Sequence, residues 1–370
     1  MKITMFYHSL FSDWNHGNAH FLRGVVDELH AKNHEVTVYE PYNGWSLRNM
    51  LLDHGMQTIH QFQEYYPNLK GAFYDDDNRD EIEFIVEDSD LVIVHEWNAP
   101  HLIKILGRIK RKHGFLLLFH DTHHRAISKP KEMEQFDFSD FDGALVFGKV
   151  LKSLYDEKNW FPNVWIWHEA ADVKRFKPYP KAEKEGDLVW IGNWGDKERE
   201  DELMEFLIRP VKELGVKAKV YGVRYPDHAL RELKAAGIAY GGWLPNYKVP
   251  ETLAKYKVTL HIPRKPYVQL LHGIPTIRPF EAMACGIPLI CSPWHDTEAL
   301  FQKGKDYLPA TDGEKMREHI QDLLEDHSKA DALSLHANNT ILDRHTCSHR
   351  VGQLETIVSQ LRLQQSIPIN

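Results

Sequence analysis

A short segment in the C-terminal half combines a cation, a predicted helix start and a carboxylate. Arg278 stands at the start of the short predicted helix that contains EAMACG, after a loop held open by Gly273 and Pro275. The free N–H groups and the dipole of a helix start favour an anion, and the planar guanidinium fork suits phosphate oxygens. Glu281, one turn in, accepts hydrogen bonds only when ionised, which suits the vicinal hydroxyls of a ribose. The pattern predicts a nucleotide site; the alternative for Glu281 is a helix-start residue favoured by the dipole.

A second glycine turn, GNWGD, follows the predicted strand DLVWIGN. Gly192 lacks a Cβ, so the turn, including Asn193, can bring its backbone close to a ligand. Lys197 and Arg199 follow, and we expect one or both cations to face a diphosphate. The alternative is an ordinary turn with cations nearby.

In the N-terminal half, the predicted strand FLLLFHD ends with His120 and Asp121. The carboxyl end of a parallel strand is the edge at which such sheets bind ligands. Gly17, with Asn18, lies in the first strand-to-helix turn and is expected to approach the same edge. The alternatives are a buried histidine satisfied by a backbone carbonyl and an ordinary turn glycine.

The abundance of histidine makes metal binding a second candidate chemistry. His120, Asp121, His123 and His124 offer metal ligands, which makes a metal-dependent hydrolase the alternative reading. Neighbouring residues of an extended segment point to opposite sides, and no HExxH spacing is present, so we expect no metal site. Further ligands for the alternative are available on the first strand and turn, at His8, His16 or His20.

The acidic run at Asp75, Asp76 and Asp77 heads a polar helical stretch. Carboxylates complement the helix dipole at such a position. We interpret the run as a solvated face and not as a metal site.

Short apolar runs alternate with helical patterns along most of the chain, which is typical of parallel βαβ construction. The first half contains the runs KITMFYH, EVTVYEP, LVIVHEW, FLLLFHD, GALVFG and VWIWHE, and the second half DLVWIGN, AKVYG, KVTLHIP and PLICSP. A stretch rich in proline and charge separates the two series. Beyond Tyr307 the pattern is helical, with no further strand expected. Two α/β domains with a cleft between their sheets are therefore predicted.

Composition narrows the classes of partner. The 45 basic and 53 acidic residues give a net charge of −8, which offers no general attraction for nucleic acid. The three cysteines cannot form a complete set of disulfides, and none is paired at metal-ligand spacing, which favours a reducing compartment. The opening MKITMFYHSL lacks the features of a signal peptide, and no apolar run approaches the roughly 18 residues that span a bilayer. We expect a cytoplasmic protein, with peripheral membrane contact left open.

The segment RPFEAMACGIPLICSP resembles the donor-binding motif of GT-B glycosyltransferases. It is close to the large retaining family with the pattern E-x7-E, and its R-x-F-E form is similar to the spore-maturation-type branch. HEAADVKRFKP resembles the interdomain segment of these enzymes, and WIGNWGDKERE the glycine turn that opens their second domain. The resemblance covers about residues 163 to 310. Gly273 departs from the pattern, because it stands eight residues before Glu281, where the family has its first glutamate.

The resemblance implies two Rossmann-like, doubly wound α/β domains facing a central cleft. The expected boundaries are an acceptor-side domain at 1–170, a linker at 171–186, a nucleotide-sugar-binding domain at 187–343, and a C-terminal helix at 344–370 that packs back on the first domain. The implied donor-binding residues are Gly17, Gly192, Asn193, Lys197, Arg199, Arg278 and Glu281, and the implied catalytic residues are His120, Asp121 and Arg278.

The implied activity is metal-independent transfer of a sugar, a hexose by type, from a nucleoside diphosphate sugar, with retention of configuration. The donor is a co-substrate and no cofactor is expected. The acceptor is a small molecule, glycan or protein. The missing first glutamate bears on the donor sugar and on the stereochemical outcome, and a non-catalytic nucleotide or glycan binder is the third reading.

Overall fold

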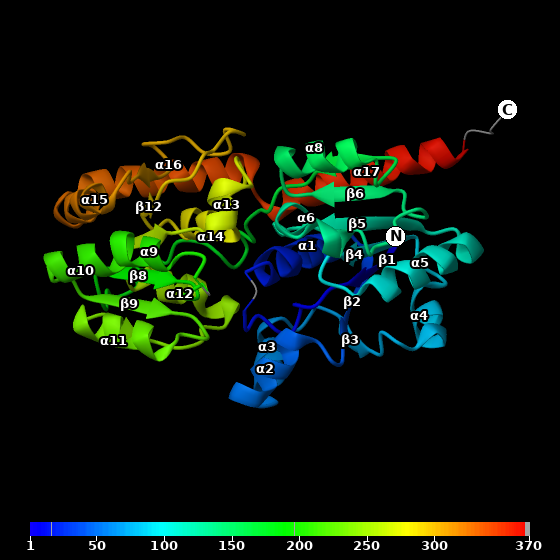
Figure 1. Ribbon diagram of the computed structural model, residues 1–370, viewed down its shortest axis with the longest axis horizontal. Coiled ribbons are helices and arrows are strands. Elements are labelled where there is room, and N and C mark those ends of the chain that lie inside the picture. Colours follow the sequence, from blue (N-terminus) through cyan, green and yellow to red (C-terminus); the bar gives the residue numbers. More distant parts are fainter. Residues whose placement is uncertain (16, 196, 367–370) are drawn as a thin grey trace. The chain divides into compact units, whose positions relative to one another are not determined.

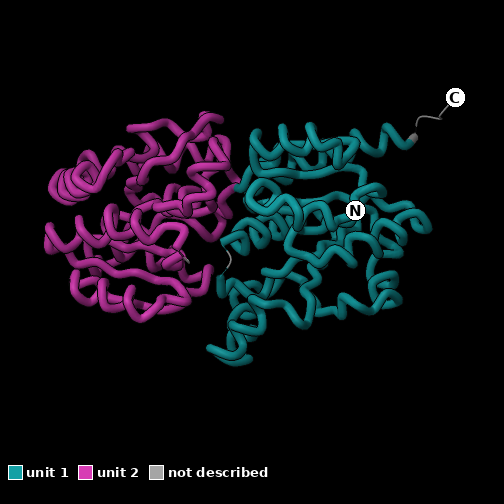
Figure 2. Tube along the Cα trace, in the orientation of Figure 1, with its two compact units in different colours: residues 1–169, 347–370 teal, residues 170–346 magenta. Residues whose placement is uncertain are grey.

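The chain folds into two compact units (Figure 2). The computed structural model describes residues 1–15, 17–195 and 197–366. Unit 1 comprises residues 1–169 together with the chain from Cys347 onward, and unit 2 comprises residues 170–346.

Unit 1 is built around a parallel sheet of seven strands within the described residues, in the order β3-β2-β1-β4-β5-β6-β7. The central strands β4 and β5 are buried along their whole length, as strands between two helix layers must be. The strands are β1 (Lys2–Phe6), β2 (Glu35–Pro41), β3 (Gly71–Tyr74), β4 (Leu91–His95), β5 (Leu116–Asp121), β6 (Gly143–Val146) and β7 (Val164–Ile166).

Helices cover the sheet of unit 1 (Figure 1), and the last helix of the chain returns to it. The Trp167 Nε1 donates to the Arg350 carbonyl at 2.9 Å, which ties the end of the sheet to that last helix. The helices are α1 (Ala19–Ala31), α2 (Trp45–His54), α3 (Gln57–Tyr65), α4 (Arg79–Val86), α5 (Pro100–His113), α6 (Arg125–Ser128), α7 (Pro130–Met133), α8 (Lys149–Lys158) and α17 (Cys347–Ser366).

Unit 2 contains a second parallel sheet, of six strands within the described residues, in the order β10-β9-β8-β11-β12-β13. Its strands are β8 (Leu188–Ile191), β9 (Ala218–Tyr221), β10 (Ala239–Tyr240), β11 (Val258–His261), β12 (Leu289–Cys291) and β13 (Leu308–Pro309). Its helical segments are α9 (Glu200–Leu203), the π-helical turn η1 (Met204–Ile208), α10 (Arg209–Leu214), α11 (Asp227–Ala235), the 3-10 turn η2 (Asn246–Lys248), α12 (Val249–Ala254), α13 (Lys265–Gln269), α14 (Ile277–Ala284), α15 (Gly313–Glu325) and α16 (His327–Arg344).

The predicted fold class is confirmed: both sheets are parallel, helix-covered and doubly wound. The expectation of no strand beyond Tyr307 is wrong, because β13 pairs with β12 through Leu308 and Pro309. Two residues at a sheet edge carry no periodic signal, and the same holds for β10. All three cysteines are buried, and none of them forms a disulfide.

Each sheet reverses its strand order at one point, and that point locates the crevice where doubly wound sheets bind ligands. The reversal lies between β1 and β4 in unit 1 and between β8 and β11 in unit 2. Among the described helices, none combines the length and apolar character needed to cross a membrane.

Candidate nucleotide site at the sheet edge of unit 2

The loops after β8 and β11 meet at the point where the strand order of unit 2 reverses. The β8 loop begins with Gly192 and Asn193, and the β11 loop begins at Ile262. The Arg199 guanidinium joins the two loops: Nε and Nη2 donate to the Asn193 carbonyl at 3.0 and 2.6 Å, and Nη1 donates to the Ile262 carbonyl at 3.0 Å. Arg199 therefore sets the spacing of the crevice walls.

Further contacts hold the Gly192 turn against the loop that follows β9. The Tyr225 hydroxyl donates to the Gly192 carbonyl at 2.8 Å, and the Val223 N–H donates to Asn193 Oδ1 at 2.8 Å. A Cβ on Gly192 would lie 2.7 Å from the Trp190 ring, so a larger residue would displace that ring. The turn is thus closely packed, and its expected closeness to a ligand depends on glycine at this position.

Lys197 lies in the same loop with an exposed side chain. Its φ of 72° is in the left-handed region that non-glycine residues seldom adopt. Strained backbone at a loop tip beside a crevice is common at ligand sites. Lys197 has an exposed side chain, whereas Arg199 is half-buried and uses its guanidinium to bind two backbone carbonyls. Of the two cations expected to face a diphosphate, Lys197 is therefore exposed to solvent and Arg199 is engaged by the protein.

Glu281 and Arg278 are brought together on α14. The Glu281 carboxylate is 1% exposed. Its Oε1 accepts from Asn246 Nδ2 at 2.7 Å, and its Oε2 accepts a hydrogen bond from Arg278 Nη1. A carboxylate has about four lone-pair sites, which is more than these two hydrogen bonds use.

Arg278 keeps donors available. Its side chain is 29% exposed, and within the described residues only Nη1 has a hydrogen-bond partner. Arg278 and Glu281 also line one small pocket, closed by apolar side chains of α12 and the sheet. The predicted cation and carboxylate therefore share one site and are paired with each other.

The N-cap residue of α14 leaves the N–H groups of the first turn without an acceptor from its own side chain. Thr276 occupies the N-cap position but makes no side-chain hydrogen bond to the first turn. Its hydroxyl instead lies 3.1 Å from Nε2 of His261, the last residue of β11. Burial, together with the charge of Arg199, lowers the pKa of His261 to about 3, so this imidazole is neutral. The first-turn N–H groups of α14 are thus not satisfied by the cap side chain.

Three arginine side chains at this edge of the sheet, Arg199, Arg264 and Arg278, repel one another. Burial, with the positive charges of Arg264 and Arg278, lowers the pKa of Arg199 to about 9. Arg264, on the β11 loop, is paired with Glu198 at 3.2 Å. Three guanidinium groups near a helix start form a place where an anion would be stabilised.

Two residues of this candidate site, Arg264 and Asn246, were not predicted from the sequence. Arg264 carries a usable signal, because a cation directly after a buried strand lies at the ligand edge of a parallel sheet. Asn246 carries none, since it lies on η2, 35 residues before its partner Glu281, and only the packing of η2 against α14 brings the two together.

In unit 1, His120 and Asp121 end β5 as expected, but they face opposite sides of the sheet. Nδ1 of the 1%-exposed His120 lies 2.7 Å from the Tyr7 hydroxyl, and its ring contacts Trp167 with centroids 4.8 Å apart. Nε2 of His120 is buried and has no hydrogen-bond partner among the described residues. Burial lowers the pKa of His120 to about 3, so the ring is neutral.

Asp121 belongs to a buried polar cluster on the other face. Its Oδ2 accepts from the Tyr155 hydroxyl at 2.7 Å, and its Oδ1 accepts from the His123 N–H at 2.9 Å. Burial raises the pKa of Asp121 to about 6. Burial also raises the pKa of nearby Glu96, which is paired with Arg125. Asp121 is therefore a group that changes protonation near neutral pH.

The turn that contains Gly17 lies beside the end of β5. The Gly17 carbonyl accepts from the His20 N–H at 3.1 Å, which begins α1. The neighbouring Asn18 donates from its side chain to the Thr122 hydroxyl, directly after β5. This contact brings the first strand-to-helix turn to the carboxyl edge of the sheet.

The four residues of the alternative metal site do not form one in the described part of the chain. His120 and Asp121 are engaged by tyrosines, as above, and Nδ1 of His124 lies 2.8 Å from the Ser128 hydroxyl. The His123 ring lies against His124 and Trp97, with centroids 4.0 and 4.8 Å away. His16 lies outside the described residues. Among the residues that the structure describes, no convergent set of histidine ligands supports a metal-dependent hydrolase.

Within the described residues, the one group of three His, Cys, Asp or Glu side chains with ligand atoms all within 4.8 Å is Asp75, Asp76 and Asp77. Asp75 and Asp77 are exposed, and the group lies just before α4, whose N-cap Asn78 accepts from the Glu81 N–H at 3.2 Å. Acidic groups of this kind complement a helix start without any ion.

Part of the chain and its overall fold are similar to known glycosyltransferases. Residues 199–356 match a family model described as glycosyl transferase-like. No curated protein matches the sequence.

Three solved structures are similar over nearly the whole chain. HepE of Anabaena, in complex with UDP and glucose, has a TM-score of 0.66 and 13% identity, covering 97% of this chain and 99% of that one. Sucrose-phosphate synthase of Thermosynechococcus elongatus has a TM-score of 0.67 and 12% identity, covering 98% and 100%. An α-glucosyltransferase in complex with UDP-glucose and DNA containing an abasic site has a TM-score of 0.71 and 14% identity, covering 97% and 99%. The chain therefore has the GT-B fold of these glycosyltransferases.

Proposed function

We propose that this protein is a nucleotide-sugar-dependent glycosyltransferase and that unit 2 binds the donor. The observation that carries the proposal is the meeting of Arg278, Glu281 and the uncapped start of α14 beside Arg199 and Arg264. A diphosphate would add negative charge among these three guanidinium groups, two of which already have a carboxylate partner. The family model over residues 199–356 and the GT-B fold support the same assignment.

Each element of the donor has a proposed partner. The diphosphate binds the α14 N-terminus, the free N–H groups of Arg278 and the ammonium group of Lys197. The ribose hydroxyls donate to Glu281, which Asn246 holds in place at 2.7 Å. Arg199 acts through the backbone carbonyls of Asn193 and Ile262 and does not itself need to touch the donor.

In the proposed reaction the bond between the sugar and the diphosphate breaks, and the diphosphate oxygen keeps the electron pair. The acceptor hydroxyl forms the new glycosidic bond. Charge that develops on the leaving diphosphate is stabilised by donors already in position, a contribution worth about 10²–10³ in kcat for a single donor. With retention, the acceptor oxygen attacks from the leaving-group face and passes its proton to a diphosphate oxygen.

Unit 1 is proposed to serve the acceptor and the transferred sugar. His120 offers the buried, unpartnered Nε2 for a sugar hydroxyl. If the reaction inverts configuration, a base is needed. Asp121, whose pKa burial raises to about 6, is then the candidate. The anomeric configuration of the product, read by NMR, decides between these two routes.

The proposal predicts specific binding of a nucleoside diphosphate to the whole protein. UDP, GDP, ADP and CDP are titrated by calorimetry against the wild type and against Arg278→Ala, Glu281→Gln and the control Arg231→Ala, whose side chain is exposed on α11. One charge-assisted hydrogen bond is worth about 1.5–3 kcal/mol, so Arg278→Ala should weaken binding by roughly 10- to 150-fold. Glu281→Gln should weaken the ribose contact alone, by about 10-fold.

Two results would contradict the proposal. One is the absence of binding by all four nucleotides. The other is equal affinity of Arg278→Ala and Arg231→Ala for the nucleotide that binds. Hydrolysis of the corresponding nucleotide sugar in the absence of acceptor distinguishes an enzyme from a non-catalytic binder. Transfer that survives EDTA supports charge stabilisation by guanidinium groups, and loss of transfer restored by Mn²⁺ argues against it.

A further inference from the structure

Two loops of unit 2 meet beside the start of α14. One is the loop of residues 271–276, which leads into that helix, and the other is the loop of residues 292–301, which follows β12. The Gly273 N–H donates to the His295 carbonyl at 2.6 Å, and the rings of His272 and His295 lie with centroids 5.5 Å apart. Both loops lie at the carboxyl edge of the sheet, because the Ser292 N–H donates to the carbonyl of His261, the last residue of β11, at 2.9 Å.

The side chain of Glu298 fills the space in front of Gly273. A Cβ built on Gly273 would lie 2.8 Å from Cγ of Glu298 and in closer conflict still with the Thr297 hydroxyl. Gly273 also has a φ of 93°, which disfavours any other residue. A side chain at position 273 would therefore conflict with the other loop, and the acidic side chain whose stem lies at this place is that of Glu298.

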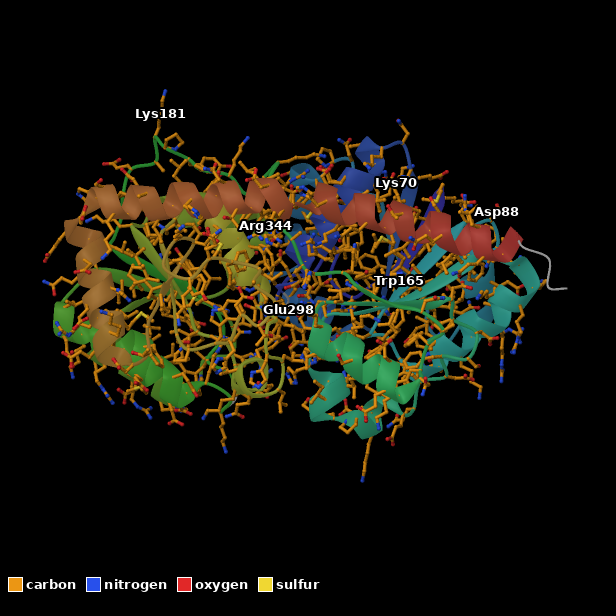
Figure 3. All side chains as sticks on the ribbon, turned by 90° about the horizontal axis from the view of Figure 1, so that it is seen from above. Lys70, Asp88, Trp165, Lys181, Glu298 and Arg344 are labelled. Carbon is orange, nitrogen blue, oxygen red and sulfur yellow. The ribbon has the colours of Figure 1, made fainter. Side chains whose placement is uncertain are left out.

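The loop that carries Glu298 has a fixed shape. Both carboxylate oxygens of Asp296 accept backbone hydrogen bonds, from Leu300 N–H at 3.1 Å and from Phe301 N–H at 2.9 Å. Ala299 adopts a left-handed φ of 53°, which completes the turn. Asp296 thus serves the backbone, whereas Glu298 is partly exposed and is labelled in Figure 3.

The order of groups in a nucleotide sugar determines which of them meets Glu298. With the ribose at Glu281 and the diphosphate at the first turn of α14, the donor runs along the helix toward its N-terminus. The glycosyl group is attached beyond the second phosphate, so it lies over the loop that leads into the helix. That loop contains Gly273, and the Glu298 side chain lies against it. This step rests on the proposed function.

We propose that Glu298 is a specificity-determining residue that accepts hydrogen bonds from hydroxyls of the transferred sugar. A carboxylate is acceptor-only and takes two neighbouring hydroxyl donors well, which makes its contact sensitive to the orientation of those hydroxyls. The proposed sugar site then has a carboxylate even though position 273 is a glycine. The chain supplies one from the loop after β12 instead of the loop before α14.

The test compares sugar binding with nucleotide binding in the full-length protein. The variant is Glu298→Gln, which keeps the size of the side chain and removes its charge, and the control is Glu232→Gln, an exposed acid on α11. The probes are UDP, UDP-glucose and UDP-deoxyglucoses that each lack one hydroxyl. UDP affinity should stay within about twofold of wild type, while UDP-glucose affinity should fall by roughly 10- to 150-fold, the loss of one charge-assisted contact.

The deoxy series supplies a double-mutant cycle. In the wild type, removal of the contacted hydroxyl should weaken binding about tenfold or more, and in Glu298→Gln the same removal should have little further effect. Equal losses in both proteins would overturn the proposal, as would unchanged UDP-glucose affinity in Glu298→Gln. If UDP itself fails to bind the wild type along with the other three nucleotides, the proposed function fails instead, so the two failures are distinguishable.

Stability is measured in parallel, because Glu298 packs tightly against Gly273. Glu298→Asp keeps the charge on a shorter side chain and serves as the second variant. It should retain UDP binding and fall between wild type and Glu298→Gln in its discrimination among the deoxy sugars. A loss of UDP and UDP-glucose binding in equal proportion, in both variants, would mean that Glu298 only holds the loop.

Discussion

Arg199 gives the sharpest test of how the candidate site is built. Its guanidinium makes three hydrogen bonds to two carbonyls, those of Asn193 and Ile262, and it lies over the Trp190 ring at 5.0 Å. Arg199→Met keeps an unbranched apolar stem on that ring and removes every donor. The two carbonyls then lose their partners, and the loops after β8 and β11 lose their connection.

The expected magnitude follows from opposing effects. Each carbonyl left unpaired in a part-buried place costs about 1–3 kcal/mol, giving roughly 2–6 kcal/mol for two. Removing a guanidinium that burial and the charges of Arg264 and Arg278 disfavour offsets part of this cost. We therefore expect the free energy of unfolding to fall by about 1–4 kcal/mol. Affinity for the bound nucleotide should fall only about tenfold, because the walls of the crevice shift while Arg278 remains.

The assay is urea unfolding of the full chain followed by tryptophan fluorescence, with nucleotide titrations on the folded protein. Trp190 lies under the Arg199 guanidinium, and both Trp190 and Trp194 belong to the buried core of unit 2, so they report on its unfolding. Arg231→Met on the exposed face of α11 is the matched control. The reasoning is refuted if Arg199→Met unfolds within about 0.5 kcal/mol of wild type while nucleotide affinity drops more than about 100-fold, because Arg199 would then contact the ligand directly.

Three further substitutions test the framework of both units. Burial raises the pKa of the Glu40 carboxyl from its usual 4.5 to about 8, so the folded protein holds this proton more tightly than the unfolded chain does. As the pH rises from 4.5 to 8, the free energy of unfolding of the wild type should therefore fall by about 1.4 kcal/mol per pH unit relative to Glu40→Gln. Parallel stability curves for the two proteins would contradict this assignment. Tyr7→Phe leaves Nδ1 of buried His120 without its 2.7 Å partner and should destabilise the protein by about 1–3 kcal/mol in thermal or urea unfolding; an effect below about 0.5 kcal/mol would show that the ring finds another partner. Gly273→Ala should lower both stability, by at least about 1 kcal/mol, and UDP-glucose affinity, since the added Cβ displaces Glu298; a variant as stable as wild type would show that the loop after β12 adapts freely.

The fold could be predicted from sequence because its signals are local. Runs such as LVIVHEW and FLLLFHD are long and apolar enough to be read as buried strands, and α1 and α14 follow from their apolar spacing and flanking turns. Strands β10 and β13 could not be predicted in this way, since two residues define no period. They form only because a neighbouring strand offers its edge.

The candidate site was predictable where its residues share one helix. Arg278 and Glu281 are three positions apart on α14, so sequence spacing alone puts them on one face. That spacing does not show that the two side chains form an ion pair with each other. The role of Arg199 could not be predicted either, because one of its two carbonyl partners, that of Ile262, lies 63 residues further along the chain and in another loop.

The sequence by itself determined the parallel α/β construction, the glycine turns at the strand ends and the cation–carboxylate pair on α14, since each depends on residues close along the chain. Only the tertiary structure decided that Asn246 holds Glu281, that Arg199 braces two loops, and that Glu298 occupies the room in front of Gly273. These contacts join separate segments through the packing of whole elements. Hydrophobic burial along many residues positions those elements, so no single motif in the sequence encodes the contacts that result.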